Sequence, residues 1–115
     1  MVEPLRDPKK LQAQVEQFQR MQRQVSLLAS QRQQMLMQIE ELKMAREYLD
    51  GSKEGAQIYK AVGNLLVETD KKGAGKEIVE RMEVFEVREK ALKKQENSSR
   101  QKLEGMRAEL EKAVA

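Results

Sequence analysis

The chain has 115 residues, of which 36% are charged and only four are aromatic, which excludes a large, compact apolar core. It contains neither cysteine nor histidine, so disulfides, a thiol nucleophile, the usual zinc ligands and the usual proton shuttle are excluded. We therefore do not expect an enzyme. The net charge is +3, and the 22 basic and 19 acidic residues are interleaved along the chain, so we expect no nucleic-acid partner.

Targeting segments and cofactor motifs are not predicted. The first eight residues lack the apolar core of a signal peptide, and no apolar run approaches the roughly 20 residues that span a bilayer. Gly75-Lys76 resembles part of a phosphate loop, but Glu77 stands in place of Ser or Thr, and Asp70 in place of the first glycine. We expect a soluble, cytoplasmic protein with no cofactor, metal or membrane partner.

The first element is a predicted long helix over residues 7–50. Asp7 is a candidate N-cap, Pro8 suits the first helical position, and Asp50-Gly51 is a stop signal. The helix would be about 60 Å long, so a partner helix must cover its apolar stripe. The stripe comprises Leu11, Val15, Phe18, Val25, Leu28, Met35, Ile39, Leu42 and Leu49.

A β-hairpin is predicted next, over residues 56–70. Gly63-Asn64 suits the two turn positions, which pairs Val62 with Leu65. Both faces of the hairpin are largely apolar, and an isolated hairpin is not stable in water, so we expect it to join a sheet or barrel shared between subunits. The expected assembly residues are Ile58, Tyr59, Val62, Gly63, Asn64, Leu65, Leu66 and Val67.

The last element is a second predicted helix, over residues 76–114. We expect it to begin after Gly73 and Gly75, because glycine is a poor helix former. Its seam follows the four-three spacing of a coiled coil. The seam residues are Ile78, Met82, Phe85, Glu89, Leu92, Glu96, Ser99, Leu103, Met106, Leu110 and Ala113.

The hairpin reverses the chain, so the two helices should pair antiparallel. The register of the two stripes brings Glu96 opposite Arg32. One hypothesis is that this pair is a polar layer that sets the register of the coil. The alternative is that both side chains simply extend to solvent. The predicted fold class is thus mostly α, a long antiparallel two-helix coiled coil whose single hairpin joins an intersubunit β-barrel.

The hairpin residues 58–67 between two helices, together with residues 82–90 of the second helix, resemble the archaeal-type β subunits of prefoldin. The resemblance covers nearly the whole chain, as a single domain over residues 1–115. It implies an ATP-independent chaperone, a hexamer of two α-type and four β-type subunits with six protruding coiled coils. It also implies that the tips hold unfolded polypeptide and deliver it to a group II chaperonin.

Apolar side chains near both chain ends fit this role. Both chain ends should meet about 60 Å from the hairpin, at the tip of the coiled coil. Fraying of the helices at this tip would expose apolar residues. Several tips of one assembly that bind the same client would add avidity. These residues are either client-binding or ordinary seam residues, and the two roles are compatible if the end opens. The candidate client-binding residues are Leu5, Leu11, Val15, Phe18, Leu103, Met106, Leu110 and Val114.

The main competing interpretation is a coiled-coil scaffold or tether that oligomerises through its hairpin. Such a protein would reach its final oligomer alone and would not protect an unfolded client. A membrane-surface helix fits less well, because the polar faces are not selectively basic.

Overall fold

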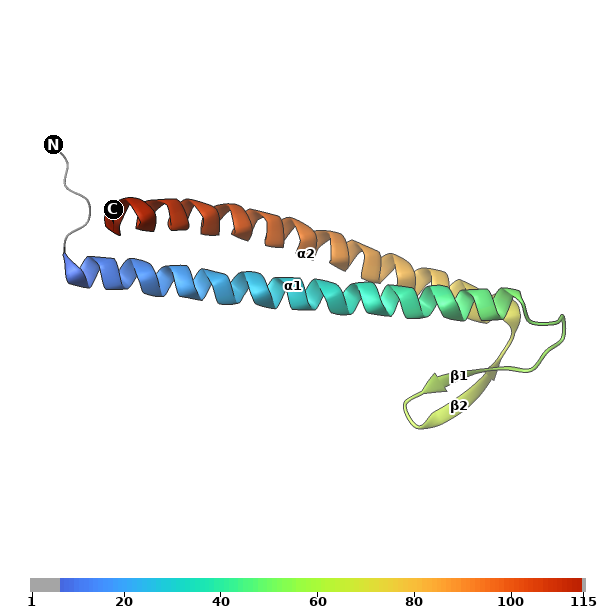
Figure 1. Cartoon of the computed structure of the whole chain (residues 1–115). Coiled ribbons are helices and arrows are strands. Elements are labelled where there is room, and N and C mark those ends of the chain that lie inside the picture. Colours follow the sequence, from blue (N-terminus) through green and yellow to red (C-terminus); the bar gives the residue numbers. More distant parts are fainter. Residues whose placement is uncertain (1–6, 115) are drawn as a thin grey trace. The chain divides into compact units, whose positions relative to one another are not determined.

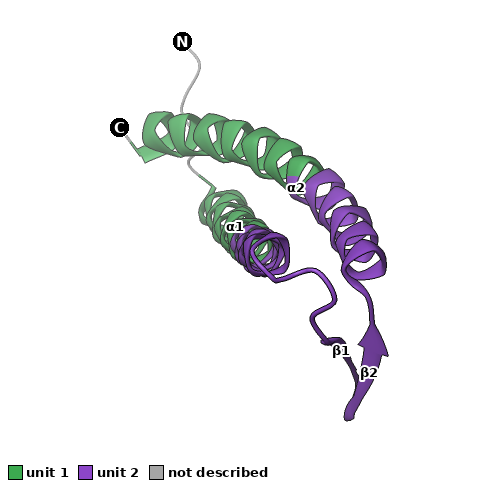
Figure 2. Cartoon of the chain, turned by 90° about the vertical axis from the view of Figure 1, so that its right-hand side faces the viewer, with its two compact units in different colours: residues 1–32, 90–115 green, residues 33–89 purple. Residues whose placement is uncertain are grey.

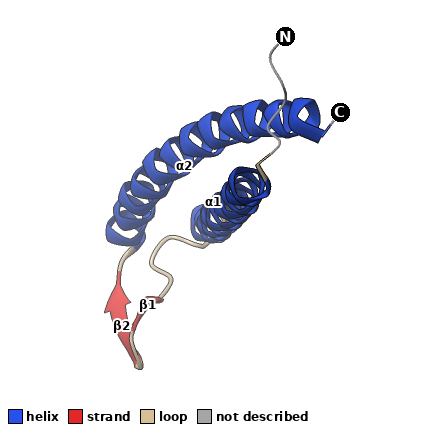
Figure 3. Cartoon of the chain, turned by 90° about the vertical axis from the view of Figure 1, so that its left-hand side faces the viewer, coloured by secondary structure: helices blue, strands red, loops and turns tan. Residues whose placement is uncertain are grey.

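The computed structural model describes residues 7–114, so Leu5 lies outside the described residues. Two long helices flank a two-stranded antiparallel hairpin, which confirms the expected order of elements (Figures 1 and 3). The elements are α1 Pro8–Asp50, β1 Ile58–Val62, β2 Leu65–Thr69 and α2 Lys71–Val114. Among these described residues, neither helix has an apolar stretch long enough to cross a membrane.

The chain forms two compact units (Figure 2). We call residues 7–32 and 90–114 the terminal unit, because they contain the described parts near both chain ends, and residues 33–89 the hairpin unit. Each helix contributes to both units. The two units are described separately below.

Helix α1 begins and ends where its sequence signals predict. The N–H of Lys9 donates to Asp7 Oδ1 at 3.0 Å, so Asp7 is the N-cap. At the other end, the N–H and the hydroxyl of Ser52 both donate to the carbonyl of Leu49. Lys71 Nζ also donates to the carbonyls of Asp50 and Ser52, at 3.2 and 3.1 Å. The last carbonyls of α1 are therefore satisfied by side chains as well as by backbone.

The hairpin has the predicted register, with Val62 opposite Leu65 and Ile58 opposite Thr69. Gly63 has a φ of +58°, whereas Asn64 does not have a positive φ. A left-handed glycine at the first turn position alone is the pattern of a type II′ turn, whose twist matches that of the strands. Only Gly63 of the two predicted turn residues therefore needs the left-handed region.

Helix α2 begins at Lys71, so the prediction of a start at residue 76 is wrong. Asp70 caps the helix, because its Oδ1 accepts a 2.6 Å hydrogen bond from the N–H of Gly73 and its carbonyl accepts one from the N–H of Ala74. A Cβ at residue 73 would lie 2.9 Å from the same Oδ1. The glycine thus permits the close approach of the cap. A good cap contributes about 1 kcal/mol, which offsets a glycine cost of about 1 kcal/mol.

The four-three seam of α2 is confirmed, since none of its eleven predicted positions is exposed. Helix α1 follows the same spacing, but Val15 does not belong to its seam. Val15 is 38% exposed, and Gln14 takes the less exposed position beside it. The stripe prediction was wrong at this point because it followed apolar character and not spacing. The most buried apolar side chains are Val25 in the terminal unit and Ile39 and Leu49 in the hairpin unit.

Candidate functional site

A buried carboxylate with two arginines lies within the terminal unit. Glu96 Oε1 is 3.5 Å from Arg32 Nη1 on the other helix, as the antiparallel register predicts. The Glu96 side chain is only 8% exposed, so it does not extend to solvent. Arg100, which the sequence analysis missed, donates from Nε to Glu96 Oε2 at 2.9 Å. Its position four residues after Glu96 is the signal that could have identified it. The role of the pair in setting the register remains a prediction.

The environment of Glu96 lowers the pKa of its carboxyl group from the ordinary glutamate value. The hydrogen bond from Arg100 is the largest cause. Burial acts in the opposite direction, and the positive charges of Arg100 and Arg32 add to the lowering. The arginines therefore hold Glu96 in its ionised form within the seam.

Acidification should weaken the terminal unit through this carboxylate. Because the pKa is lower in the folded state, the stabilisation is fully present above the unfolded value of about 4.3 and is lost as pH falls through the folded value. We expect Glu96→Gln to melt at a lower temperature than the unchanged chain at neutral pH, with the difference shrinking as the pH falls below about 4.3. Thermal melts followed by circular dichroism across this pH range measure the effect. A melting difference that stays constant with pH would contradict it.

The predicted client-binding residues differ in exposure. Leu11, Phe18, Leu103, Met106 and Leu110 are half-buried in the seam of the terminal unit. Val15 and Val114 are exposed. In the closed terminal unit, an unfolded chain therefore has direct access to the last two, and the seam residues become fully available only if the helices separate.

The seam near the chain ends also contains an unsatisfied polar atom. Gln14 Oε1 is buried and has no hydrogen-bond partner. A buried polar atom without a partner costs about 1–3 kcal/mol. Gln14 was missed in the sequence analysis, although its place in the four-three spacing identifies it as a seam residue.

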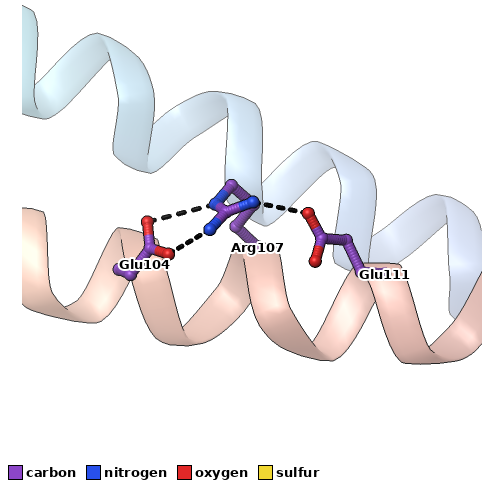
Figure 4. Close-up of polar contacts among 3 residues, drawn as sticks. All are labelled: Glu104, Arg107 and Glu111. Carbon is purple, nitrogen blue, oxygen red and sulfur yellow. Dashed lines mark hydrogen bonds and ion pairs between the residues drawn. The ribbon is translucent and has the colours of Figure 1, made fainter.

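Arg107 is held between two carboxylates on the surface of α2 (Figure 4). Its Nε donates to Glu104 Oε2 at 3.1 Å, and its other nitrogens contact Glu104 and Glu111. The hydrogen bond from Arg107 lowers the pKa of Glu104, and the same bond raises the pKa of Arg107. Exposed pairs of this kind contribute little to stability. The single positive charge of Arg107 offsets one of the two carboxylate charges.

The predicted assembly residues present apolar side chains on both faces of the hairpin. Leu65 and Leu66, which point to opposite faces, are 68% and 75% exposed. Tyr59 and Val62 are also exposed, Val67 is marginally so, and Ile58 is half-buried. Lys60 Nζ lies 3.3 Å from Glu77 Oε2, which ties β1 to α2 within the hairpin unit. The single chain thus leaves most of the apolar surface of the hairpin open to solvent.

Two features of the surface were not anticipated. Apolar side chains off the seam are exposed on α1, among them Leu27, Met37, Met44 and Tyr48.

The charges are also less evenly interleaved than predicted. The described terminal unit has twelve basic and six acidic residues, a net charge of +6, whereas the hairpin unit has nine basic and twelve acidic residues, a net charge of −3.

Comparison with known proteins gives a consistent family assignment. Residues 12–115 match the family model of the prefoldin subunit. The prefoldin β subunit of Thermococcus onnurineus is 36% identical over 107 residues, which cover 93% of this chain and 92% of the relative. The β subunit of Sulfurisphaera tokodaii is 34% identical over 110 residues, which cover 96% of this chain and 88% of the relative.

Solved structures show the same fold. The crystal structure of the prefoldin β subunit from Thermococcus strain KS-1 matches with a TM-score of 0.83 and 34% identity, covering 92% of this chain and 93% of that chain. A second solved structure, that of the protein named prefoldin beta2 subunit from the same strain, matches with a TM-score of 0.73 and 25% identity, covering 79% of this chain and 97% of that chain. The likeness therefore extends from sequence to the arrangement of helices and hairpin.

Proposed function

Because the chain belongs to the prefoldin family, in its β class, and is thus a chaperone subunit that assembles with other prefoldin subunits, we propose a specific assembly and activity for it. The chain is one of four β-type subunits that join two α-type subunits in a cytoplasmic hexamer. It holds unfolded polypeptide at its chain ends without ATP and delivers it to a group II chaperonin.

The observation that carries the proposal is the exposed hairpin between two long helices. Leu65 and Leu66 on its opposite faces are largely exposed in the single chain, and β1 and β2 pair only with each other among the described residues. A two-stranded sheet with two apolar faces gains stability by pairing its edges and covering its faces. Neighbouring hairpins of an oligomer can supply both, which supports assembly through this element.

The chain ends support the client-binding part of the proposal. Phe18, Met106 and Leu110 lie in the seam of the terminal unit, close to exposed Val15 and Val114. Apolar side chains that become accessible at a loosely held end bind unfolded chains weakly, and several such ends together bind with useful avidity. Met106 adds an adaptable thioether to this surface.

Two measurements on the full chain test the proposal together. The mass of the assembly, with and without an α-type prefoldin subunit, should show a hexamer only when that subunit is present. The hexamer should then suppress aggregation of a chemically denatured client protein in the absence of ATP. A coiled-coil scaffold would instead reach its final oligomer alone and leave client aggregation unchanged, which would overturn the proposal.

A further inference from the structure

A row of lysines follows α2 through the terminal unit. Lys90, Lys93, Lys94 and Lys102 are all exposed, and none of the ion pairs found among residues 7–114 involves them. The row covers about 18 Å of helix, which is the length of about five or six residues of extended polypeptide. These cations are available to an external anionic partner.

Two adjoining grooves run along this row. One, of about 500 Å³, is lined by Lys94 and Lys102 together with Leu28 and Ser99. The other, of about 580 Å³, is lined by Lys90, Lys93 and Lys94 together with Ala91. Lys94 borders both grooves, and we call the two grooves together the lysine trough, which lies along α2 and is bordered on one side by Leu28 of α1. Leu28 and Ala91 give it apolar patches between the cationic groups.

Three acidic residues of the terminal unit already interact with arginines. Glu96 interacts with Arg32 and Arg100, while Glu104 and Glu111 interact with Arg107 (Figure 4). Half of the six acidic side chains in the described terminal unit are therefore occupied by arginines and not by the lysines of the trough. The four lysines of the trough are a third of the twelve basic residues of this unit, and they contribute to its net charge of +6 without being neutralised by these three carboxylates.

We propose that the lysine trough selects clients, binding unfolded polypeptide segments in which acidic residues flank apolar ones. The inference rests on the proposed chaperone function and adds a substrate class to it. The lysines attract the acidic residues, and Leu28 and Ala91 accept the apolar residues between them. Charge complementarity of this kind governs partner choice and association rate more than it governs total affinity.

Two unstructured peptides test the inference. They have identical apolar residues, but one has glutamate and the other has lysine at the flanking positions. Fluorescence anisotropy with the assembled protein should show at least about tenfold tighter binding of the glutamate peptide at low salt, and a smaller ratio at about 1 M salt. The triple variant Lys90→Glu, Lys94→Glu and Lys102→Glu should abolish or reverse that ratio.

The matched control carries the same charge change in the hairpin unit, as Lys43→Glu, Lys53→Glu and Lys72→Glu, and should keep the peptide preference. Circular dichroism checks that both variants are folded, and the salt titration of the unchanged protein tests the inference without any variant. Equal loss of preference in both triple variants would overturn the inference, because net charge alone would then explain it.

Three further outcomes distinguish a failure of this inference from a failure of the proposed chaperone function. Equal binding of both peptides, with client protection retained, would overturn the selectivity and leave the chaperone function standing. Binding of neither peptide, without any client protection, would overturn both. A single-stranded oligonucleotide that bound as tightly as the glutamate peptide and with the same sensitivity to the triple variant would identify the trough as a nucleic-acid surface instead, which would also overturn the inference.

Discussion

Replacing Leu65 with aspartate should abolish assembly while the helices of the chain remain folded. Leu65 is 68% exposed in the single chain and lies opposite Val62, so the substitution removes little burial within the chain itself. In an assembly that covers this face, the carboxylate would be buried without a partner, at a cost of several kcal/mol. Native mass spectrometry with an α-type subunit should show subunits in place of a hexamer, with unchanged helix content by circular dichroism.

Leu27 offers a matched control for this substitution. It is also an exposed leucine, at 58%, but it belongs to α1 in the terminal unit and not to the hairpin unit. Leu27→Asp should therefore leave the mass of the hexamer unchanged. If Leu65→Asp assembled normally, or if both variants failed to assemble, the hairpin would not be the specific contact between subunits.

The main elements were predictable because each has a strong local signal. The four-three spacing defines the seam of α2 regardless of residue type, so even Glu96 and Ser99 were placed correctly, and both are buried. Gly63 follows β1 at a position where a two-residue turn needs a positive φ, which defines the hairpin register. Long-range pairing then followed from geometry, as the contact between Arg32 and Glu96 shows.

The errors arose where a feature depends on a specific three-dimensional contact. Gly73 was taken for a helix breaker because the bond between its N–H and the Asp70 carboxylate depends on a close approach that composition does not reveal. Val15 was placed in the seam because it is apolar, although spacing favours Gln14. The separation of charge appeared only once residues 7–32 and 90–114 were known to form one unit. Roles in assembly and client binding remain predictions, because both depend on other chains.

Replacing Gln14 with leucine should stabilise the terminal unit and reduce its protection of clients. The substitution removes the buried Oε1 that has no partner and adds an apolar side chain at a seam position, which together should gain about 1–3 kcal/mol. If clients bind when the helices separate near Leu11 and Phe18, a more stable seam lowers the population of that open state. Hydrogen exchange of the backbone amides of α1 should slow, and more client should aggregate at equal chaperone concentration.

Gln17 provides the control, because the same substitution can be made there on an exposed side of the same helix turn. Gln17→Leu adds the same apolar side chain without removing a buried polar atom, so it should leave hydrogen exchange and client protection unchanged. Slower exchange in Gln14→Leu with full client protection would show that clients bind the closed end, through exposed residues such as Val15 and Val114. Lower client protection in both variants would indicate that client binding depends on the polarity of the surface near residue 14 and not on separation of the two helices.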